Sequence, residues 1–136
     1  MEDSWTTQLI GRTVTAVEQW EAQPCIVKLS GGYSVQIESL WRLLTSGTLT
    51  RTRQDEGQFF GHKVPVQALC ELSVKLHGRA LTAVHVTQGT ADLHLHFGDH
   101  VLQAIADSAG YEAWQVEGPS STVAVGQGGG NVVVWS

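Results

Sequence analysis

The sequence predicts a mainly β protein: two pseudo-repeated antiparallel meanders that form a sandwich or an open barrel, with one short helix between them. A nine-residue phrase, residues 9–17, recurs as residues 76–84 with six identical positions. Each copy opens a β-branched run, which favours strands, and turn residues recur at the short spacing of sandwiches and barrels. One meander alone is barely stable, so we expect the two apolar faces to bury each other. We predict a single domain over residues 1–136, with an internal repeat of 9–64 and 76–136.

The first repeat is expected to begin with a three-stranded meander. Its predicted strands are residues 12–20, 25–29 and 33–37. We favour a three-residue loop over 30–32, because it sets Cys25, Val27 and Leu29 opposite Ile37, Val35 and Tyr33, with every apolar side chain on one face. Residues 40–44 predict a further strand that continues toward Thr50.

Between the repeats, Pro65 suits a first helical turn and predicts a helix over residues 65–75. The second meander is predicted as strands 79–87, 90–97 and 100–105, with Gln88-Gly89 as a tight turn. Apolar and polar residues alternate from Ala91 to Phe97, as in a half-buried strand. Three later strands are expected over residues 112–116, 122–125 and 132–135. Gly126–Gly130 predicts a hairpin turn and not a phosphate loop, since neither a Lys-Ser/Thr pair nor a helix follows it.

Five of the six histidines lie between His77 and His100. A two-residue turn at Gln88-Gly89 would set His85 opposite Asp92, and His94 and His96 share one strand face. These four residues are a candidate adventitious metal site, because His-x-His on a strand is a ligand spacing. The favoured interpretation is the polar, solvated face of an amphipathic strand. We therefore expect no cofactor.

No pattern of an enzyme stands out. The chain has no Gly-x-Ser-x-Gly elbow, and the pairings of Cys25 with His62 or Cys70 with His77 lack supporting context. We expect both cysteines to be reduced, buried and structural. Glu112 lies beside Tyr111 and Trp114, where a carboxylate can have a raised pKa. A structural carboxylate is the simpler interpretation, so a non-enzymatic protein is expected.

The charge balance points to a protein partner. A net charge of -5 with eight Lys and Arg spread along the chain disfavours nucleic acid and suits a basic protein. Trp20 stands near a predicted turn with Glu18 and Glu21 beside it, so these three residues form the candidate partner site, with Trp41 as a second exposed aromatic. The alternative is that Trp20 caps the core.

The start of the sequence is acidic, and no apolar run approaches the roughly 18 residues that span a bilayer. We therefore expect a cytoplasmic protein that does not bind membranes. A homodimer is compatible with these features.

The second half carries a resemblance. The run from His77-Gly78-Arg79 to Phe97-Gly98-Asp99, the stretch Tyr111-Glu112-Ala113-Trp114 and Gly128-Gly129-Gly130 before Val133-Val134-Trp135 resemble an uncharacterised family of small, single-domain bacterial β-rich proteins. Some of these occur in the company of polymorphic-toxin immunity proteins. A proline often precedes the final glycines in that family, whereas Gln127 stands here.

This resemblance implies a bacterial cytosolic protein with an immunity-type role, and it supplies no catalytic residue. The function we predict is a non-enzymatic protein-binding module, in its specific form an immunity protein that neutralises a basic toxin domain. The alternative is a small-molecule or metal-binding module that uses the histidine-rich face or a cleft between the repeats. A hydrolytic enzyme with an unrecognised site is a third option.

Overall fold

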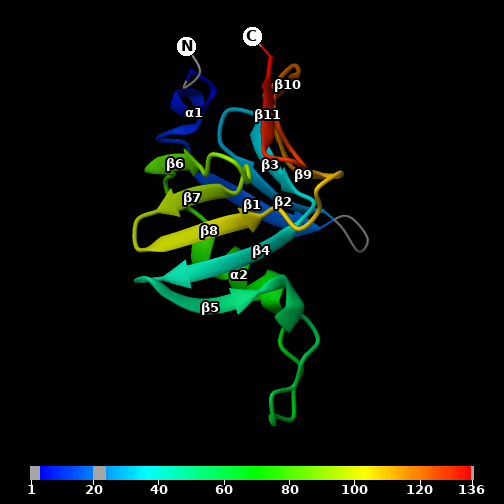
Figure 1. The fold of residues 1–136 in the computed structure, drawn as a ribbon. Coiled ribbons are helices and arrows are strands. Elements are labelled where there is room, and N and C mark those ends of the chain that lie inside the picture. Colours follow the sequence, from blue (N-terminus) through cyan, green and yellow to red (C-terminus); the bar gives the residue numbers. More distant parts are fainter. Residues whose placement is uncertain (1–3, 20–23, 136) are drawn as a thin grey trace.

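A computed structural model describes residues 4–19 and 24–135 of the protein. The chain is mainly β, as predicted, and its two antiparallel sheets do not close into a barrel, so the sandwich alternative holds (Figure 1). The six-stranded sheet runs in the order β1 Val14–Gln19, β2 Cys25–Leu29, β3 Tyr33–Ile37, β9 Glu112–Glu117, β10 Thr122–Gln127 and β11 Asn131–Val134. The five-stranded sheet runs in the order β5 Thr48–Thr52, β4 Leu40–Thr45, β8 His100–Ile105, β7 Leu93–Phe97 and β6 Ala83–Val86.

One hairpin matches the prediction from sequence and another does not. The β2–β3 register is the predicted one, with Leu29 opposite Tyr33 and a three-residue loop between them. The single strand predicted from residue 40 toward residue 50 is wrong, because the chain reverses at Ser46 and Gly47 between β4 and β5. Both residues have positive φ, 50° and 80°, and positive φ at both central positions is what a tight two-residue hairpin needs.

The predicted turn at Gln88-Gly89 is also wrong. β6 ends at Val86 and β7 begins only at Leu93, so the connection is a longer loop closed by a hydrogen bond from the Ala91 amide to the Thr87 carbonyl, 2.9 Å. Ala91 is fully buried with φ at 63°, and its carbonyl accepts the Trp114 indole N–H at 2.7 Å. A contact with the other sheet therefore fixes the conformation of this loop. The residues of the loop itself do not reveal that contact, so the sequence could not predict it.

The two copies of the repeated phrase pair with each other. Thr13 and Ala80 form an antiparallel bridge, and these two residues are equivalent in the phrase. The hydrogen bonds on either side occur in matched pairs: Gly11 N to Leu81 O at 2.7 Å with Gly78 N to Val14 O at 2.8 Å, and Val14 N to Arg79 O at 2.9 Å with Leu81 N to Arg12 O at 2.8 Å. Such exchanged pairs are the pattern of a local twofold relation through the bridge.

The same relation extends through the strands. In one meander Val27 lies between Val17 and Val35, and in the other Leu95 lies between Val84 and Leu102. After its third strand each chain half crosses to the opposite sheet: β4 pairs with β8, and β9 pairs with β3. The two crossovers therefore lie at the same end of the sandwich, because Ile37 at the end of β3 pairs with Trp114 at the start of β9.

One buried cluster joins both sheets and both helices, which are α1 Ser4–Leu9 and α2 Ala68–Leu76. Helix α1 was not predicted; it places Trp5 in a stack with Trp114, with ring centroids 5.5 Å apart. Helix α2 packs against β1 and begins three residues later than predicted. The residues around Pro65 form neither helix nor strand, and Val66 exchanges backbone hydrogen bonds with Gln58 and Gly57.

Both cysteines are free, and only one matches the expectation of burial. Cys25 is buried in the core, and burial raises the pKa of its thiol to about 12. Cys70 is exposed on α2, contrary to prediction. Its neighbours Ala68 and Leu72 supply the buried stripe of the helix, so Cys70 falls on the outer side. No helix in the described part of the chain is long and apolar enough to cross a membrane.

Candidate functional site

A polar cleft of about 690 Å³ opens where the two crossovers lie side by side. The residues that line it are Glu38, Arg53, Asp107, Ser108, Tyr111 and Glu112. They come from the β3–β4 crossover, from the start of the short helix η1 (Arg53–Asp55) and from the β8–β9 connection. The cleft thus depends on the exchange of strands between the sheets, which brings residues 38 and 112 to the same end of the molecule.

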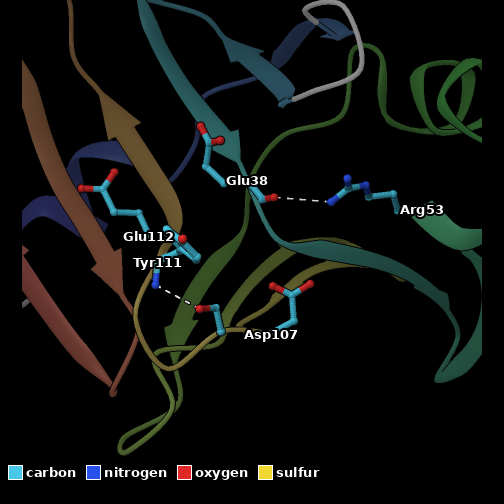
Figure 2. A pocket seen from close by; sticks show the side chains of 6 residues that line it. Glu38, Arg53, Asp107, Tyr111 and Glu112 are labelled. Carbon is cyan, nitrogen blue, oxygen red and sulfur yellow. Dashed lines mark hydrogen bonds between the residues drawn. The ribbon is translucent and has the colours of Figure 1, made fainter.

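A single carbonyl holds the two crossovers together. The Ala113 carbonyl accepts hydrogen bonds from the Glu38 amide at 2.9 Å, the Ser39 amide at 3.1 Å and the Ser39 hydroxyl at 3.1 Å. Arg53 approaches from the other side and donates from Nη1 to the Glu38 and Ser39 carbonyls, both at 3.4 Å. Figure 2 shows that Arg53 reaches the backbone of Glu38 while the carboxylate of Glu38 points away from the guanidinium. These bonds fix the floor of the cleft.

The β8–β9 connection forms one wall of the cleft. Its start is anchored by the Ala106 amide, which donates to the Asp92 carboxylate at 2.8 Å. Its end turns around the Ser108 hydroxyl, which accepts from the amides of Gly110 at 3.1 Å and Tyr111 at 3.0 Å. The turn leaves the Tyr111 side chain on the surface, 81% exposed. A hydrogen-bonded turn therefore presents an exposed aromatic residue beside the cleft.

The cleft has an excess of negative charge. Three carboxylates, those of Glu38, Asp107 and Glu112, share it with one guanidinium. Within the described residues, neither Asp107 nor Glu112 forms an ion pair. An arginine or lysine of another molecule could pair with these carboxylates and lie over the Tyr111 ring, which attracts cations through its quadrupole.

The predicted partner site is only partly visible. Trp20 and Glu21 lie outside the described residues. Glu18 lies on edge strand β1, where its carboxylate forms an ion pair with the Lys28 ammonium at 3.1 Å. Trp41 is 2% exposed and belongs to the core, so the expectation of an exposed aromatic at this position is wrong. Its side chain points inward because it pairs with buried Ala104 on the inner face of the sheet.

The candidate metal residues do not gather into one site. His85 lies opposite His94 and not opposite Asp92, because the β6–β7 loop is longer than predicted. Asp92 instead accepts the Ala106 amide. Both ring nitrogens of His94 have protein partners, Thr87 Oγ1 at 2.9 Å and Gln103 Nε2 at 3.2 Å. Over the residues that the structure covers, no three His, Cys, Asp or Glu side chains are placed to hold a metal ion.

The imidazole of His94 has a defined state. Arg42 Nε can only donate, and it donates to Gln103 Oε1 at 2.9 Å. The Gln103 amide nitrogen therefore faces His94 Nδ1 and donates to it, which leaves the ring proton on Nε2, directed at Thr87. Burial, followed by the charge of His85, lowers the pKa of His94. Its neighbours thus favour the neutral form of the imidazole.

Sequence reasoning missed most of the acidic cleft. Glu112 and Tyr111 were noticed only as neighbours within the Tyr-Glu-Ala-Trp stretch, while Glu38 and Asp107 gave no signal. The available clue to a surface loop was the unequal length of the two crossovers, since residues 38–39 form one and the longer segment of residues 106–111 forms the other. Even so, spacing along the chain does not reveal that β3 and β9 are paired.

The model of a family of unknown function, DUF6188, matches residues 5–136. No curated protein and no solved structure matches the chain.

Proposed function

The chain belongs to DUF6188, a family of unknown function, and we propose that it is a non-enzymatic protein-binding module whose partner inserts a basic side chain into the acidic cleft. The observation that carries this proposal is a cleft lined by the carboxylates of Asp107 and Glu112 together with Tyr111, an aromatic residue that is 81% exposed. Exposed aromatics bordered by charge are frequent binding anchors. The net charge of -5 would also speed the approach of a basic protein.

The specific role that we propose is that of an immunity protein, which would neutralise a basic toxin domain in the bacterial cytoplasm. Its support is the resemblance of most of residues 9–135 to a family of small bacterial proteins, some of which occur in the company of immunity proteins, together with the charge of the cleft. Two free cysteines are in keeping with a reducing compartment.

A cationic probe tests the site itself. We would titrate the protein with an oligo-arginine peptide and with an oligo-glutamate peptide by isothermal titration calorimetry at low and high salt. The arginine peptide should bind, and salt should weaken the binding. Tyr111→Ala should weaken it about fivefold through loss of a cation–π contact of about 1 kcal/mol, and Glu112→Gln by up to about the same factor.

Glu18→Gln is the matched control, because it removes a carboxylate of the first candidate site outside the cleft. Equal weakening by Glu18→Gln and Glu112→Gln would show diffuse attraction and contradict a site in the cleft. The immunity role needs a further test. Co-expression with the product of the adjacent gene should relieve its toxicity, and the double variant Tyr111→Ala/Glu112→Gln should abolish that relief. Full protection by the double variant would contradict the proposal.

A further inference from the structure

Strand β11 forms an open edge of the six-stranded sheet (Figure 1). It pairs with β10 on one side in an unbroken register from Asn131 to Val134. From Val132 in the strand to Trp135 just after it, the residues are β-branched or aromatic, and Val133, Val134 and Trp135 are 37%, 42% and 50% exposed. An exposed, regular and apolar edge strand is a template for pairing with another strand.

The other three edge strands carry protection that β11 lacks. The pairing of β1 contains a bulge, and Glu18 on β1 forms an ion pair. The pairing of β5 also contains a bulge, and Arg51 pairs with Glu71 of α2 at 3.0 Å. Strand β6 has α1 packed against it. By contrast, no charged residue occurs from Gly118 to Ser136, and the β10–β11 register has no shift.

The register shows which backbone groups of β11 face outward. The Trp135 amide donates to the Val123 carbonyl of the β10 side at 2.9 Å. Backbone groups alternate along a strand, so Val133 also bonds toward β10, while the amides and carbonyls of Val132 and Val134 point away from the sheet. The outward groups are two donors and two acceptors, spaced as an antiparallel partner strand requires.

We propose that β11 is the interface of a homodimer, in which it pairs antiparallel with β11 of a second copy of this chain. Val132 then lies opposite Val134 of the partner subunit, and the reverse pair is equivalent by symmetry. Each pair exchanges two hydrogen bonds, so four backbone hydrogen bonds join the copies. Val133 lies on the twofold axis opposite its own equivalent.

A second copy is the occupant that the chemistry of this edge favours. An extended backbone is what satisfies outward amides and carbonyls, and β-branched side chains opposite each other are favourable cross-strand pairs. Two copies with net charge -5 each repel over most of their surfaces, but the edge is uncharged, so they can meet there. The twofold pairing uses the edge that is left open among the described residues of each copy and therefore closes as a dimer.

The inner side of this edge borders an apolar hollow that is distinct from the acidic cleft. Val132 and Val134 line a hollow of about 500 Å³ together with Trp5 of α1 and the β6 residues Val84 to Val86. Their side chains lie on the inner side of β11, since they pair with buried Gly126 and Ala124. A strand added at the edge would shield the exposed flank of Val134.

Sedimentation of the full chain over a range of concentrations tests the proposal. The parent protein should sediment as a dimer, and Val133→Lys should raise the dissociation constant at least about tenfold, because it sets two like charges directly opposite each other. Val133→Glu should do the same. A mixture of the two variants should sediment as a dimer again, since opposite charges now meet on the axis. A folding defect could not produce this rescue.

Leu49→Lys is the matched control, because Leu49 is a half-exposed apolar residue on edge strand β5 of the other sheet. It should leave the dimer intact. In the parent dimer, the Val132 and Val134 amides should exchange hydrogen slowly, and in Val133→Lys they should exchange fast while the Trp135 amide stays protected. A monomeric parent, a dimer that tolerates Val133→Lys, or a mixture that stays monomeric would each overturn the proposal.

Discussion

Each sheet has a row of five cross-strand neighbours on its outer face, and the two rows occupy equivalent positions. The residue types in the two rows differ at nearly every position. Across the six-stranded sheet the row is Glu18, Ile26, Gln36, Gln115 and Val125. Across the five-stranded sheet it is His85, His94, Gln103, Arg42 and Thr52. Only the glutamine of the third strand is common to both. The two sheets therefore share the same strand pairing, but the side chains at equivalent outer positions differ.

The inner faces differ far less. Trp41 and Trp114 hold equivalent positions, since Trp41 pairs with Ala104 and Trp114 pairs with Ile37 at the ends of the third strands. Both indoles are almost completely buried. Burial of apolar side chains in the core between the sheets fixes the register of a strand. The outer face tolerates exchange, although Ile26 and Val125 on it are also buried. The common strand pairing thus follows from the buried side chains of the inner faces. The side chains that distinguish one half from the other lie on the outer faces.

The largest effect is expected at the paired tryptophans. Trp114→Ala should lower the free energy of unfolding by about 5 kcal/mol and Trp41→Ala by about 3 kcal/mol, within the range for buried aromatic truncations. The excess arises because Trp114 also stacks on Trp5 and donates to the Ala91 carbonyl. Urea denaturation measures both. Equal losses would show that the stack and the hydrogen bond add nothing.

A slightly smaller effect is expected where β10 passes over Trp114. A Cβ at Gly126 would clash with the indole ring of Trp114, so Gly126→Ala should destabilise the fold by about 3 kcal/mol through overpacking. Gly110→Ala is the control, because a Cβ there meets nothing within 4 Å, and it should change stability by less than about 1 kcal/mol. A neutral Gly126→Ala would mean that the indole moves without cost.

The arginines of the repeated phrase provide a third comparison. Arg12 lies over the Tyr33 ring at 3.9 Å and donates to the Gln8 and Ser30 carbonyls at 2.7 and 3.2 Å. The equivalent Arg79 makes an exposed ion pair with Asp99 at 3.3 Å. Arg12→Ala should cost about 2 kcal/mol, against less than about 1 kcal/mol for Arg79→Ala. High salt should weaken only the contribution of Arg79 to stability, which thermal unfolding with and without salt measures. The reverse order of the two losses would contradict this assignment.

The smallest effect should appear as a dependence on pH. The folded state lowers the pKa of His94 below 6.5, so the unfolded chain binds more protons between that lowered value and 6.5, and stability falls as the pH drops through this window. His94→Gln should flatten the slope measured by urea denaturation at several pH values. Thr87→Val should keep most of the slope, because burial is the larger cause of the shift. An unchanged slope in His94→Gln would assign it to another group.

Local pattern was enough for part of the fold. The alternation of Leu93, Leu95 and Phe97 predicted an amphipathic strand, and all three side chains are buried. The apolar register of the β2–β3 hairpin was also predicted correctly. Where the structure departed from prediction, a distant contact was responsible: the Ala91 carbonyl meets Trp114 of the other sheet, and Val66 bonds to Gln58 instead of starting a helix.

The candidate site was less predictable, for the same reason. Trp41 looked like an edge residue, but β4 lies between β8 and β5, so the indole is enclosed. Asp107 and Glu112 acquire a common cleft with Glu38 only because the strands exchange between the sheets. Charge in the sequence indicated a basic partner, while the place where the charge collects depended on topology.

The sequence by itself determined the class of fold, because period-two alternation and turn residues act over a few positions and carry their own physical cause. It also contains the repeated phrase around Gly11 and Gly78. Only the tertiary structure decided that the copies pair with each other, that each half completes the opposite sheet, and that one edge remains open at β11. Those outcomes depend on which strands bury their apolar faces together, and pairing between strands far apart in the chain leaves no local trace.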